Sequence, residues 1–172
     1  QEDADLILAN DPDTDRLSVS VRDRDSRGGF RALSGNQTGI LLADWLLGER
    51  ARQGTMPPRP FGATSVVSSA MLERVAAAYG VDYVETLTGF KWIWDRALAL
   101  AGAGGTYVFG FEEAIGYCVG PAVRDKDGIG AAQIAAELAS ALRAQGKTLL
   151  DRLDELALEH GVYADRQVSI VL

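Results

Sequence analysis

The sequence contains few of the residues that build covalent cross-links and zinc centres. It has one cysteine, Cys118, and one histidine, His160. A single cysteine excludes an internal disulfide, and a single histidine excludes metal centres built from several histidines. The cysteine count leaves the redox compartment open, so we take a cytoplasmic location as the default expectation.

Basic residues are outnumbered by acidic ones, 17 to 24, and the sequence has neither a long apolar run nor an initiator methionine. The formal net charge is −7, which excludes a whole-surface attraction to nucleic acid or to an anionic membrane. No apolar run approaches the roughly 20 residues that span a bilayer. The start at Gln1 lacks the basic and apolar regions of a signal peptide, and we expect the chain to begin inside a longer protein.

What the sequence does contain is ordinary for a globular protein. Its 172 residues are 47% hydrophobic and 24% charged. A chain of this length can bury a core without disulfides or structural metals. We therefore expect one domain, or one domain with a piece of another, and exclude a disordered tail.

The apolar pattern predicts strands alternating with helices. Two short strands, Leu6 to Ala9 and Leu17 to Val21, are joined by an acidic turn, and the charged stretch from Arg22 to Gly29 is the best candidate for a boundary or linker. Either Ser34 or Asn36 could cap the next helix. Such alternation is typical of βαβ units and a mainly parallel sheet. Helices are expected at 40–47, 70–79, 90–100, 129–144 and 149–158, and further strands at 63–67, 83–86, 106–111 and 167–172.

The acidic turn between the first two strands is the most specific feature. Asp11, Asp13 and Asp15 alternate along it, and Pro12 stiffens it. Alternation in an extended turn can point three carboxylates to one side, which suits a hard divalent cation. The alternative is a solvated acidic hairpin tip.

A calcium EF-hand also begins with alternating aspartates, but this turn does not fit one. An EF-hand needs glycine at loop position 6 and an acidic residue at position 12, and those positions hold Arg16 and Arg22. Magnesium fits better because it uses few protein carboxylates and leaves room for a phosphate oxygen. Arg16 beside it is a natural second clamp on that phosphate.

The turn and three later stretches together resemble the α-D-phosphohexomutase superfamily, which includes phosphoglucomutase and phosphomannomutase. Asn10 to Arg16 (NDPDTDR) resembles its metal loop, and Thr86 to Ile93 (TLTGFKWI) the loop that meets the sugar phosphate. Gly110 to Tyr117 (GFEEAIGY) resembles the sugar-recognition loop, and Arg124 to Gly128 (RDKDG) the turn after it. The form of these loops is closest to the branch of phosphoglucomutase-2-like enzymes and phosphopentomutases.

The resemblance implies a fold and a place in a longer enzyme. Residues 1–30 would be the C-terminal end of domain two, as a β-hairpin remnant with the metal loop. Residues 31–172 would be domain three, an α/β unit of three αβα layers with a mainly parallel mixed sheet. The serine domain and the fourth domain would be missing, so we expect this chain alone to be inactive. The partners implied are those remaining domains and a hexose or pentose phosphate, with no nucleic acid and no membrane.

The family reaction is intramolecular phosphoryl transfer through a phosphoserine and a sugar bisphosphate. By resemblance, Asp11, Asp13 and Asp15 hold Mg²⁺, and Arg16 holds the phosphate near it as a catalytic and substrate-binding residue. A sugar 1,6-bisphosphate would act as intermediate and activator. A non-catalytic module that only binds sugar phosphates is the rival hypothesis, and the retained metal loop favours the enzyme.

The other implied roles concern the sugar. Glu112 would accept hydrogen bonds from two sugar hydroxyls, while Thr88 and Gly89 would meet the substrate. Lys126 would contact the substrate, and Lys91 would be a catalytic group for proton transfer or phosphate. The family often has serine where this chain has Ala114, so a pentose phosphate remains as open as a hexose phosphate.

Several other conspicuous residues have simpler interpretations. Glu113 is expected to face away from Glu112, and Ser68-Ser69 to form a strand end and helix cap. His160 is expected at a helix C-terminus. Cys118 is expected to be a buried thiol. Packing positions are expected for the three tryptophans, Trp45, Trp92 and Trp94.

Overall fold

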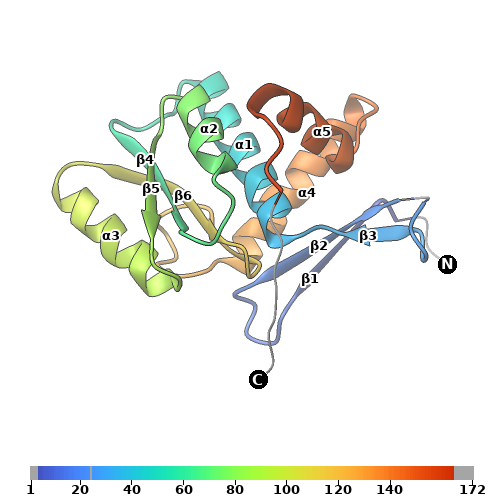
Figure 1. Ribbon diagram of the computed structural model, residues 1–172, viewed down its shortest axis with the longest axis horizontal. Helices are drawn as coiled ribbons and strands as arrows, with labels where there is room; N and C mark the ends of the chain where they lie inside the picture. The colour runs from blue at the N-terminus through green and yellow to red at the C-terminus, as the bar shows by residue number, and fades with distance from the viewer. Residues whose placement is uncertain (1–3, 24, 165–172) are drawn as a thin grey trace.

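The structure is a computed structural model that describes residues 4–23 and 25–164 (Figure 1). Within those residues, strands and helices alternate as the sequence predicts. The strand expected at 167–172 lies outside the described residues. The elements are β1 (Leu6–Asn10), β2 (Leu17–Arg22), β3 (Phe30–Ala32), α1 (Gly35–Gln53), β4 (Pro60–Ser65), α2 (Met71–Ala78), β5 (Asp82–Thr86), α3 (Phe90–Gly102), β6 (Thr106–Glu112), β7 (Gly116–Cys118), α4 (Gly128–Ala144) and α5 (Leu149–His160).

The larger sheet has the strand order β5-β4-β6-β7. Strand β4 pairs in parallel with β5 and β6, and the short β7 returns antiparallel to β6. Helix α3 lies on one side of β4 and β5, and α1 and α2 on the other (Figure 1). This arrangement confirms the expected three-layer αβα unit with a mainly parallel mixed sheet.

The smaller sheet is antiparallel, with the order β1-β2-β3. Strand β2 alternates as predicted, with Leu17, Val19 and Val21 buried. These three side chains share one hydrophobic core with α4 residues, including Ala135 and Leu138. The small sheet is therefore packed onto the α/β unit through α4, which positions the loop at its end.

The expected hairpin of β1 and β2 is present, and a third strand, which was not predicted, follows the stretch that was expected to be a boundary or linker. Phe30 pairs with Arg22 and Ala32 with Ser20, so the stretch after β2 connects two strands of one sheet. Its turn is held locally by Asp23, whose Oδ2 accepts a hydrogen bond of 2.9 Å from Ser26 Oγ. The described part of the connection, 25–29, leads the chain directly back onto β2.

The helix ends follow the sequence signals. Ser34, not Asn36, caps α1: its hydroxyl accepts from Gln37 N, and Gln37 Oε1 accepts from Ser34 N. Gly54 ends α1 in the left-handed conformation, with φ of 66°. Strand β4 ends earlier than predicted, because Val66 and Val67 lie in an exposed turn. In the part of the chain that is described, no helix has the length and apolar character needed to cross a membrane.

Candidate functional site

The acidic turn connects β1 to β2 and brings its three aspartates together. One carboxylate oxygen from each of Asp11, Asp13 and Asp15 lies within 4.8 Å of the others. Asp11 and Asp15 are half-buried, and Asp13 is exposed. The sequence prediction that alternation would point the carboxylates to one side agrees with this geometry.

Backbone hydrogen bonds shape the turn. Thr14 N donates to Asp11 O at 3.0 Å, with Thr14 at a positive φ of 60°. Arg16 N donates to Asp11 Oδ1 at 3.1 Å, and this bond is the main reason why the pKa of Asp11 is lowered. Asn10 Nδ2 closes the turn by donating to Arg16 O at 2.7 Å. Asp11 is thus kept ionised and aimed inward.

The donor set fits a hard divalent cation. All three candidate ligands are carboxylates, which magnesium prefers over nitrogen or sulfur. Asp15 Oδ1 is buried and accepts no hydrogen bond, so it is an acceptor without a partner in a place where desolvation is costly. A cation beside this oxygen would satisfy it.

Arg16 flanks the carboxylates without closing on them. Its Nε lies 3.9 Å from Asp11 Oδ2 and 3.9 Å from Asp15 Oδ1, and its side chain is 51% exposed. The backbone of Arg16 forms a bridge with Gly116, and Leu17 N donates to Ile115 O at 3.1 Å. The acidic turn is therefore joined to the β6–β7 connection of the α/β unit.

Glu112 ends β6 at the edge where the parallel strands finish. Glu112 is only 8% exposed, and its Oε1 accepts a 2.5 Å hydrogen bond from Gly89 N. Gly89 has φ of 115°, a conformation that favours glycine. The structure thus brings Glu112 together with the connection between β5 and α3, in which Thr88 is exposed and Gly89 is half-buried.

The two lysines singled out by the sequence have different surroundings. Lys126 Nζ lies 2.8 Å from Asp15 Oδ2 and 3.0 Å from Asp125 Oδ1. Partial burial lowers the pKa of Lys126, but its hydrogen bonds to Asp15 and Asp125 outweigh burial and raise the pKa. Lys91 is exposed on the first turn of α3, with Nζ 5.4 Å from the centre of the Trp92 ring. Within the described residues, Lys126 reaches the acidic turn through an ion pair and Lys91 does not.

Two glycines at helix starts, one of them in the last motif, have a steric role that sequence reasoning missed. A Cβ on Gly128 would lie 2.5 Å from Thr14 O and from Arg16 O, so α4 begins directly against the acidic turn. A Cβ on Gly35 would lie 1.9 Å from Glu113 O, so α1 begins against the β6–β7 connection. The sequence signal that could have indicated this role is a glycine directly after the capping residue of a helix: Gly35 follows Ser34, and Gly128 follows Asp127.

Glu113 points to different partners from Glu112. Its Oε2 accepts hydrogen bonds from Ser65 Oγ at 3.2 Å and Ser68 Oγ at 3.3 Å. Its backbone N donates to Ser68 Oγ at 3.1 Å. Ser69 is also structural, because its N donates to Asn36 Oδ1 at 2.9 Å and its hydroxyl accepts from the start of α2. The end of β4 therefore anchors the connection that follows Glu112.

The remaining candidates are structural. Trp94 is buried and Trp45 packs at the edge of the core, whereas Trp92 is 41% exposed and is not a packing residue. Cys118 is buried, and burial raises the pKa of its thiol. His160 is the last residue of α5, as expected.

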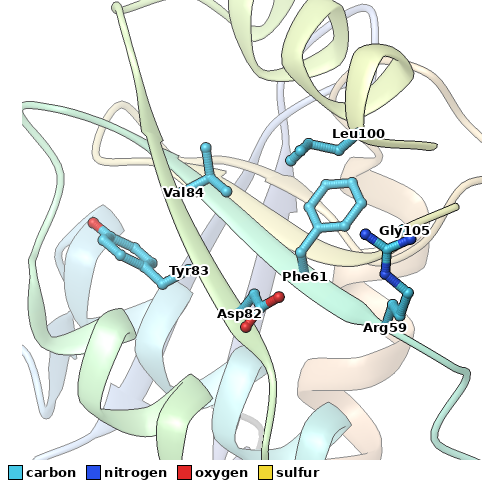
Figure 2. A pocket seen from close by; sticks show the side chains of 7 residues that line it. All are labelled: Arg59, Phe61, Asp82, Tyr83, Val84, Leu100 and Gly105. Atoms are coloured by element: carbon cyan, nitrogen blue, oxygen red, sulfur yellow. The ribbon is translucent and has the colours of Figure 1, made fainter. Parts of the chain in front are cut away.

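Two cavities among the described residues lie away from these loops. One of about 290 Å³ lies where β4 and β5 begin, opposite the edge that carries Glu112 (Figure 2). Another, of about 680 Å³, lies between β1 and β2 and the helices α4 and α5. The candidate site is thus a loop-built surface at the carboxyl edge of the sheet. The residues that line the first cavity are Arg59, Phe61, Asp82, Tyr83, Val84, Leu100 and Gly105.

Comparison with known families places this fold and loop set in one class, the phosphosugar mutases. Residues 34–159 match the model of "Phosphoglucomutase/phosphomannomutase, alpha/beta/alpha domain III". The chain therefore belongs to the phosphoglucomutase/phosphomannomutase family and contains its third domain.

Individual relatives agree. The chain is 44% identical to a Haemophilus influenzae protein named probable phosphomannomutase, over 99% of this chain and 32% of that protein. It is 42% identical to human phosphopentomutase, over 92% of this chain and 26% of that protein. The structure of Aspergillus fumigatus N-acetylphosphoglucosamine mutase, in complex with GlcNAc-6P and magnesium, shares the fold with a TM-score of 0.59 at 18% identity, covering 96% of this chain and 34% of that one. The chain thus spans about a quarter to a third of the length of these proteins.

Proposed function

We propose that this chain is the metal-binding and sugar-recognising part of a mutase that moves phosphate between the 1-hydroxyl and the 6- or 5-hydroxyl of one sugar. The main support is the docking of the acidic turn onto the connection that follows Glu112, through the Arg16–Gly116 bridge and the Lys126–Asp15 ion pair. Phosphoryl transfer depends mainly on positioning and charge neutralisation. A cation-binding turn beside a carboxylate for sugar hydroxyls supplies both.

In this proposal Asp11, Asp13 and Asp15 hold Mg²⁺, which when bound neutralises charge on the transferring phosphate. Arg16 holds that phosphate, because its guanidinium is beside the acidic turn and half exposed. Among mutases of this fold, the Aspergillus fumigatus enzyme was solved with magnesium and a sugar phosphate. That complex is consistent with a magnesium site here.

Glu112 is proposed to orient the sugar. An ionised carboxylate can accept hydrogen bonds from two vicinal hydroxyls, and the Gly89 N–H holds the carboxylate in place. Thr88 lies beside this contact and is proposed to meet the substrate. Lys126 is proposed to contact the phosphosugar, and the exposed Lys91 to bind phosphate or transfer a proton.

The phosphoserine and the grip on the distal phosphate are proposed to come from domain one, the rest of domain two and domain four of a longer enzyme. The reaction would pass through a sugar bisphosphate. The small sheet runs to Ala32 and the family match begins at residue 34, which supports a boundary a few residues after residue 30. Relatives named for hexose and for pentose phosphates match this chain equally well, so both sugar classes are proposed substrates.

A panel of hexose and pentose 1-phosphates tests the proposal. The full-length enzyme should interconvert at least one of them with its 5- or 6-phosphate, and chelation of Mg²⁺ should abolish turnover. The purified 172-residue chain should show none. Turnover by this chain alone, or full-length turnover that survives chelation, would contradict the proposal.

A further inference from the structure

Lys126 is held in a cradle of negative and aromatic groups. Besides its contacts with Asp15 and Asp125, its ammonium lies 5.6 Å from the centre of the Phe90 ring. The side chain is only 18% exposed. A lysine that is merely solvent-facing would not be bound on three sides.

The stem of Lys126 is as constrained as its ammonium. A Cβ on Gly116 would lie 2.6 Å from Lys126 Cδ, so the stem runs directly over the backbone of Gly116. Lys126 N donates to Asp125 Oδ1 at 2.7 Å, and Asp127 N donates to Tyr117 O at 2.6 Å. The backbone and stem of Lys126 are therefore anchored, and movement of the ammonium away from Asp15 is confined to the end of the side chain.

Asp15 is the carboxylate that both the Lys126 ammonium and the proposed divalent cation would bind. Its Oδ2 is paired with Lys126, and its buried Oδ1 accepts no hydrogen bond. Arg16 is too distant, at 3.9 Å, to satisfy Oδ1. Of the basic groups that the described residues place near the turn, Lys126 makes the closest ion pair.

We propose that Lys126 is an internal counter-ion of the acidic turn, which competes with the divalent cation for Asp15 and is released towards the substrate when the cation binds. The inference rests on the proposed magnesium site and adds a coupling to it. A cation next to Asp15 repels the ammonium and withdraws charge from the carboxylate that holds it. The coupling is reciprocal: the factor by which metal binding weakens the Lys126–Asp15 pair equals the factor by which that pair weakens metal binding.

The first test measures metal affinity. Mn²⁺ is titrated into the protein and the free ion is followed by electron paramagnetic resonance, for wild type, Lys126→Met and Lys126→Arg. Removal of the competing charge should tighten Mn²⁺ binding about five- to ten-fold, the low end of the usual coupling range because the turn is partly solvated. Lys126→Arg should stay within about two-fold of wild type. Lys147→Met is the matched control, since it removes the same charge from a lysine between α4 and α5 that is paired with Glu155, and should leave Mn²⁺ affinity unchanged.

The second test needs no variant. The chain has three lysines, and each acetylation site can be quantified by mass spectrometry after brief treatment with an acetylating reagent. Saturating Mg²⁺ should raise the acetylation rate of Lys126 several-fold. Lys147, whose Nζ is paired with Glu155 at 2.5 Å, is the internal reference, and its rate should not change.

The outcomes separate the inference from the proposed function. If wild type and Lys126→Met both fail to bind Mn²⁺, the magnesium site itself is wrong. If wild type binds Mn²⁺ and Asp13→Asn does not, but Lys126→Met binds no tighter and Mg²⁺ leaves the acetylation of Lys126 unchanged, only the competition is wrong. If Lys126→Met does not fold, unchanged acetylation in wild type still overturns the inference.

Discussion

Replacing Gly128 with alanine should loosen the acidic turn from the rest of the molecule. Gly128 is the first residue of α4, and its Cα faces the turn so closely that a methyl group would lie 2.5 Å from Thr14 O and Arg16 O and 2.7 Å from Asn10 Nδ2. Two of these neighbours are backbone atoms, which cannot rotate away. Either α4 or the turn must move by several tenths of an ångström.

Two opposing effects set the magnitude. Alanine favours a helix over glycine by about 1 kcal/mol in a helix interior, and less at the first residue. Overpacking of a close contact costs about 1–3 kcal/mol. We expect a net loss of about 1–2 kcal/mol, which in a chain of this size lowers the melting temperature by about 2–8 °C. Because the displaced atoms belong to the turn, Mn²⁺ affinity should fall as well.

The assay is thermal unfolding followed by circular dichroism, combined with Mn²⁺ titration. Gly102→Ala is the control: Gly102 is the last residue of α3, its φ is not positive, and a Cβ there would meet nothing within 4 Å. That variant should melt within about 2 °C of wild type and bind Mn²⁺ equally. If Gly128→Ala matches Gly102→Ala in both measurements, the close approach of α4 does not position the turn.

The remaining predictions concern chemistry, stability and reactivity. In the full-length enzyme, Asp13→Asn should impair turnover of every sugar phosphate and weaken Mg²⁺ binding. Glu112→Gln should lower kcat/KM about ten- to a hundred-fold, from a lost charged hydrogen bond of about 1.5–3 kcal/mol, and should spare Mg²⁺ affinity; equal loss of Mg²⁺ binding in both variants would refute this division of labour. Arg152→Met should destabilise the chain by about 3–5 kcal/mol in urea unfolding, because the buried Asp44 carboxylate loses its cationic partner and the hydrogen bonds of 2.9 and 3.0 Å that Arg152 donates, and keeps the one from the Tyr79 hydroxyl; a loss below about 1 kcal/mol would show that the pair is not needed. Cys118, whose thiol pKa is raised by burial, should react with a disulfide reagent at pH 8 only as fast as the chain unfolds, and rapid reaction of the folded protein would contradict that expectation.

Much of the fold could be predicted because its elements are long enough to show a period. The helix at 129–144 and the alternating strand at 17–21 both appear where the pattern placed them, to within one residue. Strands β3 and β7 have three residues each, too few to alternate visibly, and both form only because an adjacent strand supplies partners. Pattern alone cannot reveal such strands.

The early end of β4 has a similar cause. Val66 and Val67 have the residue type of a strand, which is why the sequence predicted that it would continue. The neighbouring β5 ends at Thr86, and Ser68 N turns back to donate to Ser65 O at 2.9 Å. Strand length is decided by the partner as well as by the residues themselves, and the partner's end is not visible locally.

In the candidate site too, what is local in the sequence could be predicted and what depends on tertiary contacts could not. The acidic turn is local, so its three carboxylates could be predicted from spacing alone. The pairs Lys126–Asp15 and Glu112–Gly89 join segments far apart in the chain, and only tertiary packing brings them together. Sequence reasoning could name these residues through a family resemblance, but it could not show that Lys126 lies on a proposed metal ligand.

Glu112 and Glu113 show how packing assigns different roles to identical residues. They are neighbours at the end of β6, where successive side chains point to opposite sides. On one side Glu112 meets the Gly89 N–H, whose positive φ turns a donor towards it. On the other side Glu113 meets the hydroxyls of Ser65 and Ser68 at the end of β4. Glu112 is thereby held by the Gly89 N–H, while Glu113 ties the connection after β6 to the end of β4. The chemistry of the two side chains is the same, and the neighbours that each one meets decide its role: in the proposed function, Glu112 orients the sugar.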